Sequence, residues 1–155
     1  MSVMPPSYTA NPLYGGNLIR DGLGNGSPAC AAHWALDDTI PTAHESQIYS
    51  LATVGNQLYS TSFKSLKVWD MNTKLLISDI KAHQGVIKCV KTMPTNSQGE
   101  TVGSSIFATA GDARDKCIHL WDMTTLTNMT TLRGHKGEIR ALEFSKDGKH
   151  LFSAG

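Results

Sequence analysis

The chain contains LKVWD at residues 66–70 and IHLWD at residues 118–122. Each run is short, rich in apolar residues and closed by the pair Trp-Asp, so that Trp69 and Trp121 lie 52 positions apart (69 to 121). A single Trp-Asp pair is a weak signal, whereas two in similar surroundings indicate an internal repeat. Such a repeat decides the fold class, because repeat architectures have periods of a few tens of residues.

A histidine opens each copy of this repeat. Ala43-His44 and Ala82-His83 precede the two Trp-Asp runs, and Gly134-His135 opens a third copy. His83 and His135 are separated by 52 positions (83 to 135), like the two tryptophans, while His44 and His83 are 39 positions apart (44 to 83). The histidines therefore recur in register with the Trp-Asp pairs.

The difference between the two periods comes from residues 94–105, which read PTNSQGETVGSS. This segment is polar and rich in turn-forming residues, as surface loops are. It lies between the first and second strands that we expect in the second copy, where an insertion can project into solvent without disturbing a sheet. The first two copies can therefore share one architecture.

Two regions of different composition divide the chain. Residues 1–38 are rich in Pro, Gly, Ser and Asn, which favours flexible chain over packed strands, and we expect a linker or tail there. From Ala43 onward, short β-branched and aromatic runs alternate with turn residues, and helical periodicity is absent. The sequence therefore predicts an all-β domain, which we bound at residues 39–155.

These residues resemble the WD40 repeat family, whose copies carry a Gly-His pair, an Asp before the Trp and a closing Trp-Asp, at about 40 to 45 residues per copy. The resemblance covers residues 43–155 and implies a β-propeller. Its blades would be residues 43–81, 82–133 and 134–155, the last one truncated. Because closed propellers have about 4 to 8 blades, we expect a fragment whose remaining blades come from the same longer chain.

The resemblance also implies a buried hydrogen-bond network in each blade, made by His, Ser or Thr, Asp and Trp. In the second copy these residues are His83, Thr109, Asp115 and Trp121. The first copy has His44, Ser60 and Trp69, with Phe63 where the Asp would be, and the third has His135 and Ser153. A buried imidazole or indole N–H needs a hydrogen-bond partner, and a connected network is stronger than isolated bonds.

The composition disfavours several classes of partner. Lys and Arg number 14 against 13 Asp and Glu, so the net charge of +1 gives no strong field for nucleic acid or an anionic membrane. The three cysteines lack a short paired spacing, which fits reduced thiols in a cytoplasmic, intracellular chain. No apolar run approaches the roughly 20 residues of a membrane span, and the first residues do not resemble a signal peptide.

The same histidines could suggest a catalytic or metal site. They recur once per copy, however, as a structural role requires and a catalytic role does not. We therefore expect no catalytic residue, no metal site and no cofactor within this chain, and classify it as not an enzyme.

We expect the function to lie on the propeller face where turns of successive blades converge. The resemblance places Phe63, Arg114, Gln84, Lys136 and Glu138 there, and aromatic and Arg side chains are the favoured contacts of interfaces. The sequence therefore predicts a scaffold that docks a protein or peptide within a larger protein. The alternative is the substrate-recruiting arm of a multidomain enzyme or the cargo tail of a motor, because residues 60–70 resemble propeller blades of TRAF-type RING ubiquitin ligases and of some kinesin tails.

Overall fold

The computed structural model describes residues 15–21, 34–41, 43–96 and 105–155, and it divides the chain into two units, Met1–Glu45 and Ser46–Gly155. Among the described residues every regular element is a β-strand. No helix in this part of the chain is long and apolar enough to cross a membrane. The all-β prediction is therefore confirmed.

The first unit contains one antiparallel hairpin. Strand β1 (Gly15–Asp21) pairs with β2 (Trp34–Pro41), with a register shift between Leu18 and Ile19. This differs from the expectation of flexible chain up to residue 38. Strand-forming residues such as Ile19, Trp34 and Ile40 lie within the turn-rich composition, and a count of Pro, Gly and Ser over the whole segment conceals them. The remaining parts of the expected tail, residues 1–14 and 22–33, lie outside the described residues.

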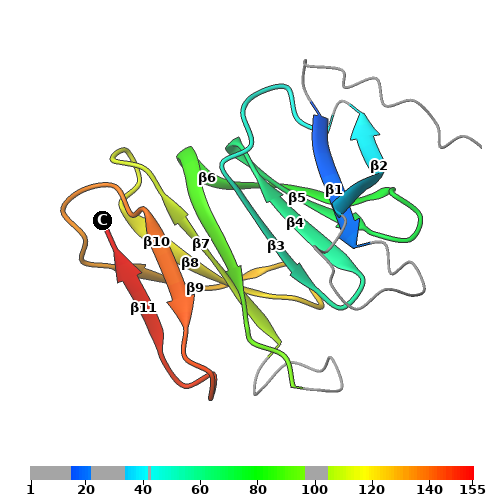
Figure 1. Cartoon of the computed structure of the whole chain (residues 1–155). Coiled ribbons are helices and arrows are strands. Elements are labelled where there is room, and N and C mark those ends of the chain that lie inside the picture. Colours follow the sequence, from blue (N-terminus) through cyan, green and yellow to red (C-terminus); the bar gives the residue numbers. More distant parts are fainter. Residues whose placement is uncertain (1–14, 22–33, 42, 97–104) are drawn as a thin grey trace, which may run out of the picture. The chain divides into compact units, whose positions relative to one another are not determined.

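The second unit contains nine strands in chain order (Figure 1). They are β3 (Ser50–Val54), β4 (Gln57–Thr61), β5 (Phe63–Asp70), β6 (Leu76–Thr92), β7 (Ile106–Gly111), β8 (Cys117–Asp122), β9 (Asn128–Arg133), β10 (Ala141–Phe144) and β11 (Leu151–Ala154). Strands β3 to β9 follow one another in a single antiparallel order, and β10 pairs with β11 as a separate hairpin.

Strand β6 belongs to two four-stranded sheets. Its first half, residues 76–81, pairs with β5, while residues 87–92 pair with β7. Figure 1 shows this long strand leaving β5 and continuing beside β7. We name β3, β4, β5 and the first half of β6 the first sheet, and the second half of β6 with β7, β8 and β9 the second sheet. The boundary of residues 81 and 82 that the repeat suggests falls at the bend between the two halves.

The aspartates of the two Trp-Asp pairs close the turn that follows each third strand. Asp70 accepts backbone hydrogen bonds through Oδ1 from Asn72 (2.9 Å) and Thr73 (2.8 Å). Asp122 accepts the corresponding bonds from the residues two and three positions later, at 2.8 and 2.7 Å. Asp side chains favour such turns because they can replace backbone acceptors locally.

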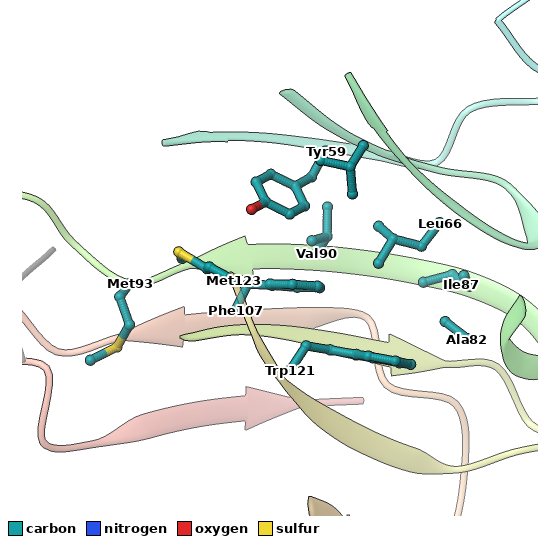
Figure 2. Packing of buried hydrophobic residues seen from close by; sticks show 10 residues of the cluster. Tyr59, Leu66, Ala82, Ile87, Val90, Met93, Phe107, Trp121 and Met123 are labelled. Carbon is teal, nitrogen blue, oxygen red and sulfur yellow. The ribbon is translucent and has the colours of Figure 1, made fainter. Parts of the chain in front are cut away.

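The main core lies between the two sheets. Tyr59 and Leu66 of the first sheet face Val90, Phe107 and Trp121 of the second, as Figure 2 shows. The rings of Tyr59 and Phe107 have their centroids 4.8 Å apart, and both side chains are fully buried. Since burial of one large apolar side chain contributes about 1.5–3 kcal/mol, this contact holds the two sheets together.

A second core lies on the other face of the second sheet. Ala108, Ala110 and Ile118 pack there against Ile139 and Leu142, which belong to the segment that forms the β10–β11 hairpin. Strands β7 and β8 are thus covered on both faces. This explains why β7 reads as a nearly continuous small and apolar run rather than an alternating one.

Candidate functional site

Four turns meet along one edge of the second unit. They comprise residues 62–64 where β4 passes into β5, residues 82–86 in the middle of β6, residues 112–116 between β7 and β8 and residues 134–140 between β9 and β10, and we call them the turn edge. Backbone hydrogen bonds tie them together: Ile87 N donates to Ser62 O (3.3 Å), Asp112 N to Val86 O (3.0 Å) and Ile139 N to Gly111 O (3.2 Å). The edge is therefore held by the two sheets and by bonds between them, and its turns are fixed relative to one another.

The second sheet supports this edge with a chain of side-chain hydrogen bonds. Trp121 donates its indole N–H to Thr109 Oγ1 (2.9 Å), which lies 2.8 Å from His83 Nε2. His83 Nδ1 lies 2.5 Å from Asp115 Oδ2. The structure thus brings together the four residues that the family resemblance implies for the network of the second copy.

These hydrogen bonds can donate in only one direction, from Trp121 towards Asp115. The Thr109 hydroxyl accepts from Trp121 and has one proton to give, which goes to His83 Nε2. Neutral His83 then donates its Nδ1 proton to the Asp115 carboxylate. Burial, followed by the neighbouring charge of His119, lowers the pKa of His83 to about 4, so the imidazole is neutral near pH 7. A buried neutral donor to a carboxylate makes a charge-assisted bond, which is stronger than a neutral one.

Asp115 keeps its charge although little of its side chain is exposed. Burial acts to raise the pKa of Asp115, but hydrogen bonds with Cys117 and His83 outweigh it and hold the pKa below the ordinary value. The backbone N–H of Gln84 also donates to Oδ2 (3.3 Å). One carboxylate therefore joins the turn between β7 and β8 to the bend in β6.

Glycine is required beside this pair. A Cβ on Gly111 would lie 2.8 Å from His83 Nδ1 and 2.8 Å from Asp115 Cβ, and a Cβ on Gly85 would clash with Asp112 Oδ1. Sequence reasoning missed both glycines. The available signal was the position of Gly111, two residues after Thr109 and immediately before the turn.

The other two copies contain parts of the same chain. In the first sheet Trp69 donates to Ser60 Oγ (2.8 Å), and in the hairpin His135 Nε2 lies 2.8 Å from Ser153 Oγ. Phe63 stands six residues before Trp69, as Asp115 stands six before Trp121, and its side chain is 44% exposed. His44 belongs to the first unit, so its place in the first network stays a prediction.

His119 is a further polar residue that sequence reasoning missed. Its ring lies edge-on to His83, with centroids 4.4 Å apart, and its Nε2 lies 3.8 Å from Asp115 Oδ2. Its Nδ1 lies 2.8 Å from both Thr131 Oγ1 and Asn128 Nδ2. Because residues two apart in a strand share a face, its position two before Trp121 was the signal that could have found it.

His83, Asp115 and His119 form a group that could in principle hold a metal ion, since one ligand atom of each lies within 4.8 Å of the others. Coordination would require His83 Nδ1 to lose the proton that it donates to Asp115. The arrangement therefore fits the hydrogen-bond network better than a metal centre.

The five residues predicted to contact a partner all lie on the turn edge. Phe63, Gln84, Arg114 and Lys136 are exposed, while Glu138 is half-buried. Glu138 forms ion pairs with Arg140 on its own turn and with Lys88 of β6, the latter at 3.7 Å. Four of the five side chains are therefore available at the surface, and the fifth is engaged within the protein.

Successive four-stranded antiparallel sheets with a repeated His, Ser or Thr and Trp network define a β-propeller repeat protein. Comparison with known families agrees: the model described as "WD domain, G-beta repeat" matches residues 74–122 and 126–155, about half of the chain. The chain belongs to the WD40 repeat family. The match begins after the first Trp-Asp pair, although β3, β4 and β5 have the same arrangement as β7 and β8 with the strand before them.

The relatives found among curated proteins are WD-repeat proteins. Nuclear distribution protein PAC1 of Arthroderma benhamiae is 30% identical over 92 residues, which cover 59% of this chain and 20% of that protein. DDB1- and CUL4-associated factor 13 of Dictyostelium discoideum is 31% identical over 97 residues (63% and 20%). WD repeat and SOCS box-containing protein 1 of Homo sapiens is 32% identical over 91 residues (58% and 20%). The matched part of the chain spans about a fifth of the length of these relatives.

Proposed function

We propose that this chain is a protein-interaction scaffold that docks a protein or peptide partner on the turn edge. Domains of WD40 repeats are in general non-catalytic interaction modules, which supports a scaffold role. The single observation that carries the specific site is the pair of exposed residues Phe63 and Arg114, presented on turns that the two sheets hold fixed.

The rigidity of the turn edge favours binding. Phe63 is the strand partner of Val86 in the pairing of β5 with β6. The turn that carries Arg114 is fixed by Asp112, whose Oδ1 accepts a hydrogen bond from the backbone N–H of Arg114 (3.0 Å). A partner that meets preformed turns loses less conformational freedom on the protein side than one that meets loose loops. Exposed aromatic and Arg side chains on such a support have the character of interface anchors.

The cysteines support an intracellular setting for this scaffold. Among the described residues, Cys89 and Cys117 are buried free thiols. Burial raises the pKa of the Cys89 thiol to about 11, which keeps it protonated and unreactive. We propose that the protein works inside the cell, where free thiols persist.

Site-specific photo-crosslinking in cells tests the docking site. Phe63 is replaced by photoreactive benzoylphenylalanine in the full-length protein, and a matched protein carries the same group at Lys146, in the turn at the other end of β10. We expect a discrete protein adduct from position 63 and none from position 146. Equal crosslinking from both positions, or only from position 146, would contradict docking on the turn edge.

A second candidate is a recruiting arm within a larger assembly. The relative named for its association with DDB1 and CUL4 favours this candidate, since that name describes attachment to other proteins. Both candidates use the same docking site and differ in what happens to the bound protein. If the crosslinked partner is covalently modified only when the full-length protein is present, this chain acts as a recruiting arm. A partner that stays unmodified supports the plain scaffold.

A further inference from the structure

The turn edge is richer in cations than the chain as a whole. Its basic residues are Lys64, Arg114, Lys116, Lys136 and Arg140. Its acidic residues are Asp112, Asp115 and Glu138. The whole chain carries a net charge of only +1, so this edge holds a local excess of positive charge that other surfaces offset.

The acidic side chains of this edge are already engaged within the protein. Asp115 accepts from His83 and from the backbone N–H of Gln84. Asp112 accepts from the backbone N–H of Arg114. Glu138 pairs with Arg140 and Lys88. These bonds hold the carboxylates in place without removing their charge, so five cations against three carboxylates leave the turn edge with a net charge of +2.

Four of the cations remain without a carboxylate. Within the described part of the chain, Lys64, Arg114, Lys116 and Lys136 form no ion pair, and all four are exposed. They come from three different places, the start of β5, the turn between β7 and β8, and the segment between β9 and β10. Backbone hydrogen bonds link the segments that carry these side chains one after another, so the four cations form a row along the edge in which the backbone is fixed.

An exposed aromatic ring lies at one end of this row. Phe63 is 44% exposed, and the ammonium group of Lys64 lies 5.3 Å from its ring centroid. In the second sheet the equivalent position holds Asp115, which is turned inward to His83. Where the second copy has an internal hydrogen-bond acceptor, the first copy thus has an apolar side chain at the surface.

We propose that the turn edge binds an acidic protein segment, with Asp or Glu carboxylates along the row of Lys64, Arg114 and Lys136 and an apolar side chain on Phe63. This inference rests on the docking function proposed above and names the chemistry of the partner. Complementary charge steers association and selects the partner, while the apolar anchor gives affinity at short range. A protein segment fits better than nucleic acid, because one exposed ring offers no succession of stacking platforms for bases.

Fluorescence anisotropy with the full-length protein tests the proposal. The probes are a short fluorescein-labelled Glu-rich peptide with one central Phe, the same peptide with Gln for Glu, and a labelled single-stranded oligonucleotide. We expect the Glu peptide to bind at least about tenfold more tightly than the Gln peptide at low salt, with the difference shrinking as salt screens the charges. Equal binding of the two peptides, or tighter binding of the oligonucleotide, would overturn the proposal.

Charge reversal locates the binding. Arg114→Glu with Lys136→Glu is compared with Lys146→Glu and Lys149→Glu, two exposed lysines of the turn between β10 and β11 that give the same change in net charge. We expect the first pair to abolish Glu-peptide binding and the second to leave it within about twofold. Equal losses in both would show a nonspecific charge effect and overturn the proposal.

The two proposals fail in different ways. If the partner that crosslinks at position 63 binds equally well to the Arg114→Glu, Lys136→Glu protein and at high salt, the acidic chemistry is wrong and the docking site stands. If position 63 yields no adduct, the docking site itself is wrong. Melting temperatures of the charge-reversed proteins show that each is folded when binding is measured.

Discussion

His83 and Asp115 meet across the turn edge at 2.5 Å, although 32 positions separate them in the sequence. His83 comes from the bend that divides β6 between the two sheets, and Asp115 comes from the turn between β7 and β8. Their bond fixes that turn beside the bend. Arg114, the residue before Asp115, is exposed, so the buried bond positions a surface group.

Replacement of Asp115 by Ala removes the acceptor of the buried His83 Nδ1 proton. We expect Asp115→Ala to lower the free energy of unfolding by about 1–3 kcal/mol, the usual cost of an unsatisfied buried donor. Urea denaturation measures this change. Asp115→Asn is the matched control: it keeps an acceptor oxygen in place and should lose less stability. If both variants unfold like the original protein, the bond does not contribute to stability.

Gly111 is predicted to tolerate no side chain. The methyl group of Gly111→Ala would lie 2.8 Å from both His83 Nδ1 and Asp115 Cβ, so the pair must move apart. We expect a loss of about 1–3 kcal/mol, as in other overpacked sites. Gly137→Ala is the control, because a Cβ there meets nothing within 4 Å. Similar stability of the two variants in urea would show that the pair is not tightly packed against Gly111.

Stability should fall as the pH falls from about 6.5 to about 4. In the unfolded chain His83 titrates near its ordinary pKa of 6.5, whereas in the folded protein burial lowers its pKa to about 4. Between these values the unfolded state binds more protons, so protonation favours unfolding. The shift corresponds to roughly 3 kcal/mol, fully present above pH 6.5 and lost on approach to pH 4.

Urea midpoints between pH 7.5 and 4.5 measure this dependence, with His83→Gln as the comparison. The variant should be less stable at neutral pH and should lose less stability over the same interval. A protein whose stability is the same at pH 7 and pH 5 would show that His83 is not buried in its neutral form. Burial also lowers the pKa of His119, so His119→Gln separates the contribution of the second imidazole.

Zinc should not stabilise this protein, although His83, Asp115 and His119 lie close enough to bind it. A metal would have to replace the proton that His83 donates to Asp115, and the bond it breaks is part of a buried network. We expect the melting temperature to be unchanged by zinc at a modest excess or by a chelator. A rise with zinc that disappears in His119→Gln would establish a metal site instead.

The repeat made much of the fold predictable. The Trp-Asp pairs recur in register with the histidines, and this fixed the fold class and the strand order around the two tryptophans. The resemblance to the WD40 family indicated which side chains of the second copy belong together, and the structure places these side chains within hydrogen-bond distance. The β1–β2 hairpin was not predicted, because its few strand-forming residues lie in a segment whose overall composition favours turns.

The features of the site that the sequence did not predict depend on contacts between residues of different strands. The need for Gly111 becomes visible only when the His83 ring is placed beside the end of β7. The approach of His119 to Asp115 depends on which face of β8 carries Trp121. The engagement of Glu138 by Lys88 joins two segments that are 50 positions apart (88 to 138). Each is set by register in three dimensions, which residue spacing alone does not give.

The affinity of the crosslinked partner for Phe63→Ala and Arg114→Ala proteins, measured together with their melting temperatures, tests the central claim most directly. Both side chains are exposed, so we expect folding stability to stay within about 0.5 kcal/mol of the original. Each substitution should weaken binding by about tenfold or more, as removal of an interface anchor does. Unchanged affinity in both variants would contradict docking on the turn edge, and a joint fall of affinity and melting temperature would show that these residues support the fold instead.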